Sequence, residues 1–375
     1  LGLEPDEVGI AGLMFGFFML VTASHFAAKS VRQAWYLGTL GAERLPFVYL
    51  LVAVAAVPSL VAYRRLAAKF PTVALIVGTC VAQAAGLLAV ELVLPRPSAT
   101  AAILFYVWTT LIFGIAVSQL WAWATEIFHA RQARRLFAFI SAGGLLGGIP
   151  GGFMAGWAAR RFGAAGALNV AVILVLTAAV IAIVISRILP TQTERSSDRS
   201  TSLDTSRVVA AFRRSPLLKS IAGLMALSAV LAQVVDLQFY WVVERVTTGL
   251  DERTGLIGNF FVWLGILAFL FQVLFTRRIH RSLGTVVGLR VLPAWILAVS
   301  VLFAVALVSA PGLLLAAVWT LKLGENGFRH SVDQASRELL FVPVPLGRRR
   351  DAKVFIDVFV QRAAEGVAGL ILLPV

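Results

Sequence analysis

The chain has 375 residues, of which 59% are hydrophobic and 14% charged, and its formal net charge is +14. A soluble domain is usually about half apolar and a quarter charged, so this composition favours a lipid-embedded protein over a soluble enzyme. Only helices and closed barrels satisfy all backbone polar groups in hydrocarbon, and the sequence lacks the alternation of barrel strands. We therefore expect an all-α polytopic membrane protein.

In chain order, apolar windows long enough to cross about 30 Å of hydrocarbon predict eleven transmembrane spans. The predicted spans are 8–28, 45–63, 72–94, 101–125, 136–159, 165–188, 217–242, 256–276, 285–308, 311–328 and 353–375. The first window is too long for a signal peptide and lacks its cleavage signature, so it is treated as a spanning helix. Because the sequence begins with Leu1 rather than Met, we expect the true N-terminus to lie outside it.

A polar stretch separates the sixth span from the seventh, and its composition cannot bury an apolar face. It predicts three parts: an N-terminal six-helix bundle at 1–188, a cytoplasmic linker at 189–215 and a C-terminal bundle of five helices at 216–375.

The two sides of this linker match at a shift of about 213 residues, which indicates an internal parallel repeat. Tyr63-Arg64-Arg65-Leu66 corresponds to Thr276-Arg277-Arg278-Ile279, and both follow an apolar span. Two related six-helix halves are typical of the major facilitator architecture. The same shift predicts a twelfth span beyond Val375, so we expect the sequence to be truncated.

Alternate connections between the spans carry most of the chain's 33 basic residues. Cytoplasmic loops hold the excess of Lys and Arg, so this pattern places the N-terminus in the cytoplasm. We expect the membrane to be the bacterial inner membrane. The positive charge is dispersed over one membrane face, so we expect a lipid bilayer and no nucleic acid as its partner.

Ionisable side chains inside spans are the default functional candidates because they are costly in hydrocarbon. His25, Lys29 and Arg32 share one helical face near the external end of the first span. They could contact an anion, with Lys29 and Arg32 binding the substrate. Alternatively, the two long side chains could snorkel to the interface.

Gln233, Asp236 and Tyr240 share a face of the seventh span, and Asp236 needs a proton, a cation or water in this apolar helix. On the eleventh span, Asp357, Gln361 and Glu365 form a stripe that should face the bundle interior. We expect Gln233, Asp236 and this stripe to contact the substrate.

Two groups of charges suggest ion pairs or gates. Lys322, Glu325 and Arg329 end the tenth span at a spacing that allows an intrahelical ion-pair series. Glu126 ends the fourth span near Arg134, so this pair could form a cytoplasmic gate or a solvated helix end.

Enzyme signatures are absent from the sequence. The single cysteine, Cys80, permits no intrachain disulfide, and the histidines lack the spacing of metal ligands. Two rows of glycine in the fifth span favour close helix packing over a phosphate loop. They comprise Gly143, Gly144, Gly147, Gly148, Gly151 and Gly152. We therefore expect no enzyme activity, no cofactor and no metal.

Several segments resemble the ATP/ADP translocase family of nucleotide transporters. Gly41-Ala42-Glu43-Arg44-Leu45-Pro46 resembles the family's Gly-Ala-Glu-x-x-Pro. Ala133-Arg134-Arg135-Leu136-Phe137, preceded by Trp121, resembles its Ala-Lys-Arg-Phe-Tyr after Phe-Trp. Ala352-Lys353-Val354-Phe355-Ile356-Asp357-Val358 resembles its Gly-Lys-Ala-Ala-Ile-Asp-Val. The resemblance implies a major facilitator-type fold and the transport of nucleotides.

The resemblance also implies roles for individual positions. Lys29 and Arg32 stand where the family has an Arg and a Lys, so the positive charge is retained. Gln33 replaces an Asp, Thr109 stands near the position of a family Glu, and Glu365 stands near that of a Lys. The substrate therefore need not be the ATP/ADP pair.

The leading hypothesis is a monomeric secondary active transporter of a small solute, either a nucleotide or another organic anion, working by alternating access between the two bundles. One alternative is a membrane sensor or assembly protein that has lost transport on the same fold. An intramembrane enzyme is a third possibility, although the six-plus-six repeat argues against it.

Overall fold

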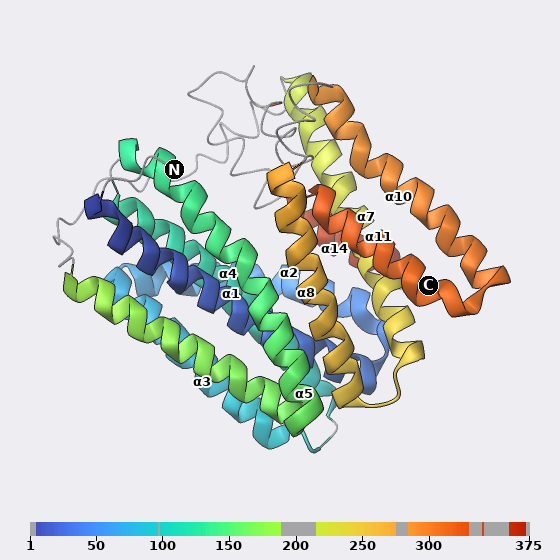
Figure 1. Cartoon of the computed structure of the whole chain (residues 1–375), viewed down its shortest axis with the longest axis horizontal. Helices are drawn as coiled ribbons and strands as arrows, with labels where there is room; N and C mark the ends of the chain where they lie inside the picture. Colours follow the sequence, from blue (N-terminus) through green and yellow to red (C-terminus); the bar gives the residue numbers. More distant parts are fainter. Residues whose placement is uncertain are drawn as a thin grey trace. The chain divides into compact units, whose positions relative to one another are not determined.

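The computed structural model describes residues 5–96, 98–128, 130–188, 215–274, 284–329, 340 and 360–372, and there it contains helices and turns but no strand (Figure 1). The α-helices are α1 (Pro5–Leu40), α2 (Leu45–Ala67), α3 (Thr72–Val93), α4 (Ala99–Ile127), α5 (Ala130–Ile188), α7 (Pro216–Val246), α8 (Leu250–Leu274), α10 (Gly284–Ser309), α11 (Leu314–Phe328) and α14 (Gln361–Leu372). Short 3-10 helices precede α2 and α11, at Ala42–Arg44 and Pro311–Leu313. The all-α prediction is confirmed for this part of the chain.

Eight described segments are long and apolar enough to cross a membrane. The predicted windows at 45–63, 72–94 and 101–125 agree with α2, α3 and α4 to within a few residues. The count of eleven spans stays a prediction, because α11 and α14 have only 15 and 12 described residues. The linker expected at 189–215 lies outside the described residues except for its last one.

Helix α1 is much longer than its predicted window of 8–28, since it continues without a break to Leu40. A hydropathy window ends at Lys29 because a charge facing lipid is costly. In the structure Arg32 and Gln33 are buried by protein, with exposed fractions of 3% and 2%, so the helix tolerates them. The sequence had suggested that these residues lie near the end of the helix. They lie within it instead.

Helix α5 consists of two helical segments that meet at Gly163, where the backbone has φ +74° and ψ −178°. Glycine adopts this conformation without the strain that a side chain would cause. The backbone N–H of Ala164 donates to Asp251 Oδ1 over 2.6 Å, which caps the second segment. The break confirms the predicted boundary between the windows 136–159 and 165–188.

The chain divides into two compact units that are not continuous in sequence. The first contains 1–42, 54–192 and 243–269, and the second contains 43–53, 193–242 and 270–375. Most of α8 thus belongs with the helices of the N-terminal half. The domain boundaries expected from the sequence remain a prediction.

Glycine-mediated contact between α1 and α5 forms the centre of the first unit. A Cβ atom on Gly143 would lie 2.5 Å from the Phe15 carbonyl oxygen, and one on Gly147 would lie 2.5 Å from that of Met19. A Cβ atom on Gly151 would likewise overlap the backbone of Ala23. In the other row, Gly144 and Gly148 face the rings of Phe18 and Phe26 on α1, whereas a Cβ on Gly152 would lie 2.5 Å from the Gly258 carbonyl oxygen of α8. The predicted packing role of the glycines is confirmed.

Replacing Gly147 with Leu should therefore destabilise the protein by about 2 kcal/mol or more, because the new side chain would have to displace the α1 backbone. Reversible unfolding of the purified protein in mixed micelles measures this change. Gly12→Leu is the matched control, since nothing lies within 4 Å of a Cβ at that position of α1. Equal stability of the two variants would contradict the packing assignment.

Candidate functional site

A buried arginine on α1 dominates the polar part of the first unit. Arg32 donates from Nη1 to Thr110 Oγ1 over 2.7 Å and to Thr109 Oγ1 over 3.4 Å. Its guanidinium carbon lies 4.0 Å from the ring centroid of Tyr106. All three partners belong to α4 and none carries a charge, and no carboxylate within the described ranges forms an ion pair with Arg32.

A second cation lies one helical turn earlier on the same face. Lys29 Nζ is 4.8 Å from the ring centroid of Phe261 and 5.7 Å from that of Phe26. His25, another turn earlier, stacks on Phe113 with ring centroids 3.7 Å apart. The residues predicted to share a face of α1 therefore do so, and aromatic rings surround them.

Further polar groups extend this face towards the end of α1. Gln33 donates from Nε2 to the Tyr106 hydroxyl over 3.3 Å, and the rings of Tyr36 and Tyr106 meet edge to face at 5.3 Å. Thr110 and Tyr106 were not predicted from the sequence. The adjacent Thr109-Thr110 pair in an otherwise apolar span was the available signal for Thr110.

Several buried polar atoms on this face have no hydrogen-bond partner among the described residues. They are Thr22 Oγ1, His25 Nδ1, Arg32 Nε and Gln33 Oε1. An unsatisfied buried polar group is costly, so these atoms mark positions where water or a solute would be stabilised. We name the set of His25, Lys29, Arg32 and Gln33 the α1 polar face.

The second unit contains a chain of ion pairs between α7 and α11. Lys322 Nζ lies 2.6 Å from Asp236 Oδ1 and 3.0 Å from Glu325 Oε2. Arg329 Nε lies 2.6 Å from Glu325 Oε1. Two cations thus alternate with two carboxylates, so the set is neutral overall.

This ion-pair chain includes Lys322, Glu325 and Arg329, which pair with one another as their spacing suggested, while their role as ion pair or gate stays a prediction. It also identifies the partner of Asp236 as a cation from another helix. Glu325 is only 1% exposed and also accepts from Asn326 Nδ2 over 2.8 Å. Arg329 additionally donates to the Ser228 carbonyl oxygen over 2.7 Å, which ties α11 to α7 a second time.

The remaining predicted site residues are less completely described. Gln233 lies one turn before Asp236 on α7, and its Oε1 atom is buried without a described partner. Asp357 and the side chains of Gln361 and Arg134 lie outside the described residues, so their expected roles stay predictions. Glu365 lies on α14 and is partly buried.

Glu126 is exposed near the end of α4 and accepts from the Thr72 hydroxyl over 2.9 Å. This contact joins α4 to the start of α3. The gate expected from its pairing with Arg134 remains a prediction.

A second buried arginine in the first unit was not predicted. Arg253, near the start of α8, donates to the Thr247 side chain and carbonyl and, over 3.3 Å, to the Ala34 carbonyl oxygen. Glu244 nearby accepts from the Ala42 N–H over 2.6 Å. These groups connect the end of α1 to the last turn of α7 and the start of α8. Their printed partners are groups of the protein itself, so we assign them a structural role and not a role in binding a solute.

Comparisons with known proteins agree with this architecture. Residues 98–372 match the family model described as TLC ATP/ADP transporter. No curated protein sequence matches the chain. Similar solved structures include the nucleoside transporter NupG, with 14% identity over 96% of this chain and 89% of that one and a TM-score of 0.70.

Two other similar structures are a bacterial homologue of the iron transporter ferroportin and the POT family transporter PepTSo. The first has 12% identity, covers 98% of both chains and gives a TM-score of 0.63. The second has 13% identity, covers 97% of this chain and 88% of that one, and gives a TM-score of 0.66. At these identities the likeness shows the fold alone, and it confirms the predicted major facilitator-type fold.

The ion-pair chain leads to a test of stability. Lys322→Met should destabilise the protein by roughly 3 kcal/mol, because it leaves Asp236 without its cation in a poorly solvated position. Adding Asp236→Asn should restore part of this loss, since the Glu325–Arg329 pair then remains balanced. Unfolding in mixed micelles is measured for the wild type, Lys322→Met, Asp236→Asn and the double variant. A double variant whose loss of stability equals the sum of the two single losses would contradict the coupling.

Proposed function

Because the chain belongs to the TLC ATP/ADP transporter family, we propose that it is a secondary active transporter that moves a nucleotide or a related organic anion by alternating access. The chain is an integral multi-pass membrane protein and a transporter. The substrate class, the mechanism and the residues involved are our proposal.

The observation that carries this proposal is the burial of Arg32 among neutral partners. Taking a charge out of water costs several kcal/mol unless an opposite charge accompanies it. Thr109, which Arg32 contacts, stands near the position where the family resemblance expects a Glu. The positive charge is therefore available to an anion that enters the site, and Lys29 adds a second cation one turn away.

The chemistry of the α1 polar face suits a phosphate attached to an aromatic base. Guanidinium groups bind phosphate oxygens with two parallel hydrogen bonds. Tyr106, Tyr36 and the His25–Phe113 stack surround the cations with ring faces and edges, and flat aromatic bases stack on such rings. This combination favours a nucleotide over a small inorganic anion.

The ion-pair chain of the second unit supports a role in coupling. Lys322 contacts both Asp236 and Glu325, so it can remain paired if one contact opens. Asp236 is 29% exposed, whereas Glu325 is 1% exposed, so Asp236 is the more accessible carboxylate. We assign Asp236, with Gln233 beside it, to contact with the solute or with a coupled proton.

The distribution of basic loops supports an N-terminus in the cytoplasm. We propose the bacterial inner membrane as the location of the protein. A monomer suffices for this mechanism, because both bundles come from one chain.

Arg32→Gln should lower the initial rate of nucleotide uptake by about tenfold or more, because a charge-assisted hydrogen bond to the solute is lost. The full chain in liposomes, loaded with unlabelled nucleotide and given labelled nucleotide outside, provides the measurement. Arg32→Lys should retain part of the rate.

Arg161→Gln is the matched control, since Arg161 is exposed on α5 and should leave uptake unchanged. An Arg32→Gln protein with unaltered kinetics would remove Arg32 from the site. The absence of uptake for every nucleotide and organic anion tested would sink the proposed function.

A further inference from the structure

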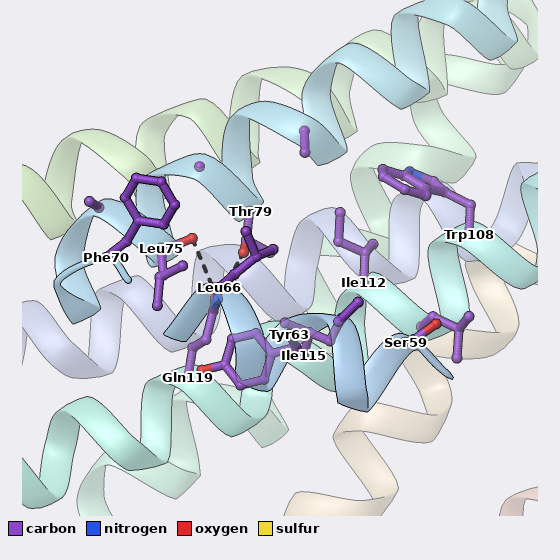
Figure 2. A pocket seen from close by; sticks show the side chains of 15 residues that line it. Ser59, Tyr63, Leu66, Phe70, Leu75, Thr79, Trp108, Ile112, Ile115 and Gln119 are labelled. Carbon is purple, nitrogen blue, oxygen red and sulfur yellow. Dashed lines mark hydrogen bonds between the residues drawn. The ribbon is translucent and has the colours of Figure 1, made fainter. Parts of the chain in front are cut away.

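A pocket of about 500 Å³ lies in the first unit between α2, α3 and α4 (Figure 2), and no residue of the α1 polar face lines it. Its lining includes Tyr63, Phe70, Gly78, Thr79, Trp108 and Gln119. Figure 2 shows Phe70 and Trp108 at opposite ends of this lining. The volume falls within the range of small-molecule sites, which is about 300–1,000 Å³.

Several of the few polar side chains of the pocket are hydrogen-bonded within the protein, and most of its wall is apolar. Gln119 donates from Nε2 to Thr79 Oγ1 over 2.9 Å, and its side chain lies beside Tyr63 (Figure 2). Ser59 donates to the carbonyl oxygen of Ala55 over 2.7 Å. A mostly apolar wall suits a hydrocarbon chain better than a polar solute.

The rim of the pocket is exposed and apolar. Leu66, Phe70 and Trp108 are 49%, 52% and 41% exposed, and they belong to or adjoin membrane-spanning helices. Exposed apolar side chains on such helices contact lipid, so the occupant can enter directly from the bilayer.

One end of the pocket carries positive charge. Arg64 and Arg65 end α2, Lys69 follows in the turn before α3, and all three are exposed. Glu126, which bonds to Thr72, is the carboxylate described at this end, so positive charge predominates. A basic cluster just outside a span attracts anionic lipid head groups.

We propose that this pocket binds an anionic phospholipid, with one acyl chain between α2, α3 and α4 and the phosphate on Arg64, Arg65 and Lys69. The lining from Ala74 to Ala82 runs about 12 Å along α3, which leads an acyl chain from the basic end into the membrane. The bilayer is as apolar as the pocket, so burial of the chain alone selects weakly. The head-group charge therefore provides the selectivity.

Native mass spectrometry of the full chain released from detergent tests this proposal with two probes, dioleoyl phosphatidylglycerol and dioleoyl phosphatidylcholine. We expect one tightly bound phosphatidylglycerol, with an affinity about tenfold higher than that of the zwitterionic lipid. Equal affinities would overturn the proposal. Displacement by inorganic phosphate alone would assign the basic cluster to a free anion, which also overturns it.

Gly78→Leu tests the acyl-chain position. Gly78 lines the pocket, and nothing lies within 4 Å of a Cβ built there, so the new side chain fills the pocket without displacing backbone. We expect at least tenfold weaker binding of phosphatidylglycerol. Gly114→Leu on α4 is the matched control, because its Cβ also meets nothing and it does not line the pocket.

If Gly78→Leu binds the lipid as Gly114→Leu does, the chain does not occupy the pocket. If Gly78→Leu fails to fold, Gly78→Ala provides a smaller obstruction and should weaken binding to a lesser extent; unchanged binding would overturn the proposal.

The head-group position is tested by Arg64→Gln combined with Arg65→Gln and Lys69→Gln. This variant should lose the preference for phosphatidylglycerol. Lipid binding is measured without any transport, so the test is independent of the proposed function. Arg96→Gln with Arg161→Gln is the control, since both residues are exposed and lie away from the pocket. A preference retained by the triple variant would contradict the assignment.

Discussion

The close contact of the α1 and α5 backbones is the constraint on which the first unit depends. A helix can approach another at this distance only where side chains are absent, and Gly143, Gly147 and Gly151 remove them at four-residue intervals. Because one side of α1 packs on α5 in this way, residues further along α1 contact other helices. Arg32 consequently meets α4, where Thr110 receives its hydrogen bond. The packing of small residues therefore determines where the charge is placed.

The two units handle buried charge in opposite ways. In the second, Asp236, Lys322 and Glu325 neutralise one another with Arg329, and the cost of removing them from water is offset locally. In the first, the described neighbours of Arg32 are hydroxyl groups and a ring face, which solvate the cation without cancelling it. The neutral ion-pair chain is satisfied by its own groups, whereas a buried cation without a paired carboxylate favours the binding of an anion.

The sequence predicted the helices well where hydropathy is uniform, as in α2, α3 and α4, because lipid exposure imposes an apolar surface on them. It placed the end of α1 too early because burial by α4 compensates for Arg32, and that compensation comes from residues far away in the chain. Spacing within one helix was enough to predict the Lys322–Glu325 pair. The pairing of Lys322 with Asp236 could not be predicted, since it depends on how α7 and α11 approach each other.

Helix α8 contributes Asp251 to the start of the second segment of α5 and Arg253 to the carbonyl of Ala34 in α1. All of these groups belong to the first unit, although α7 is synthesised between α5 and α8. During synthesis, the helices α1 to α5 therefore enter the membrane before their last partners exist. The ribosome must add more than 60 further residues beyond Ile188 before Asp251 and Arg253 are available. Until then the N-terminal helices lack the cap at Ala164 and the hydrogen bond to the Ala34 carbonyl oxygen.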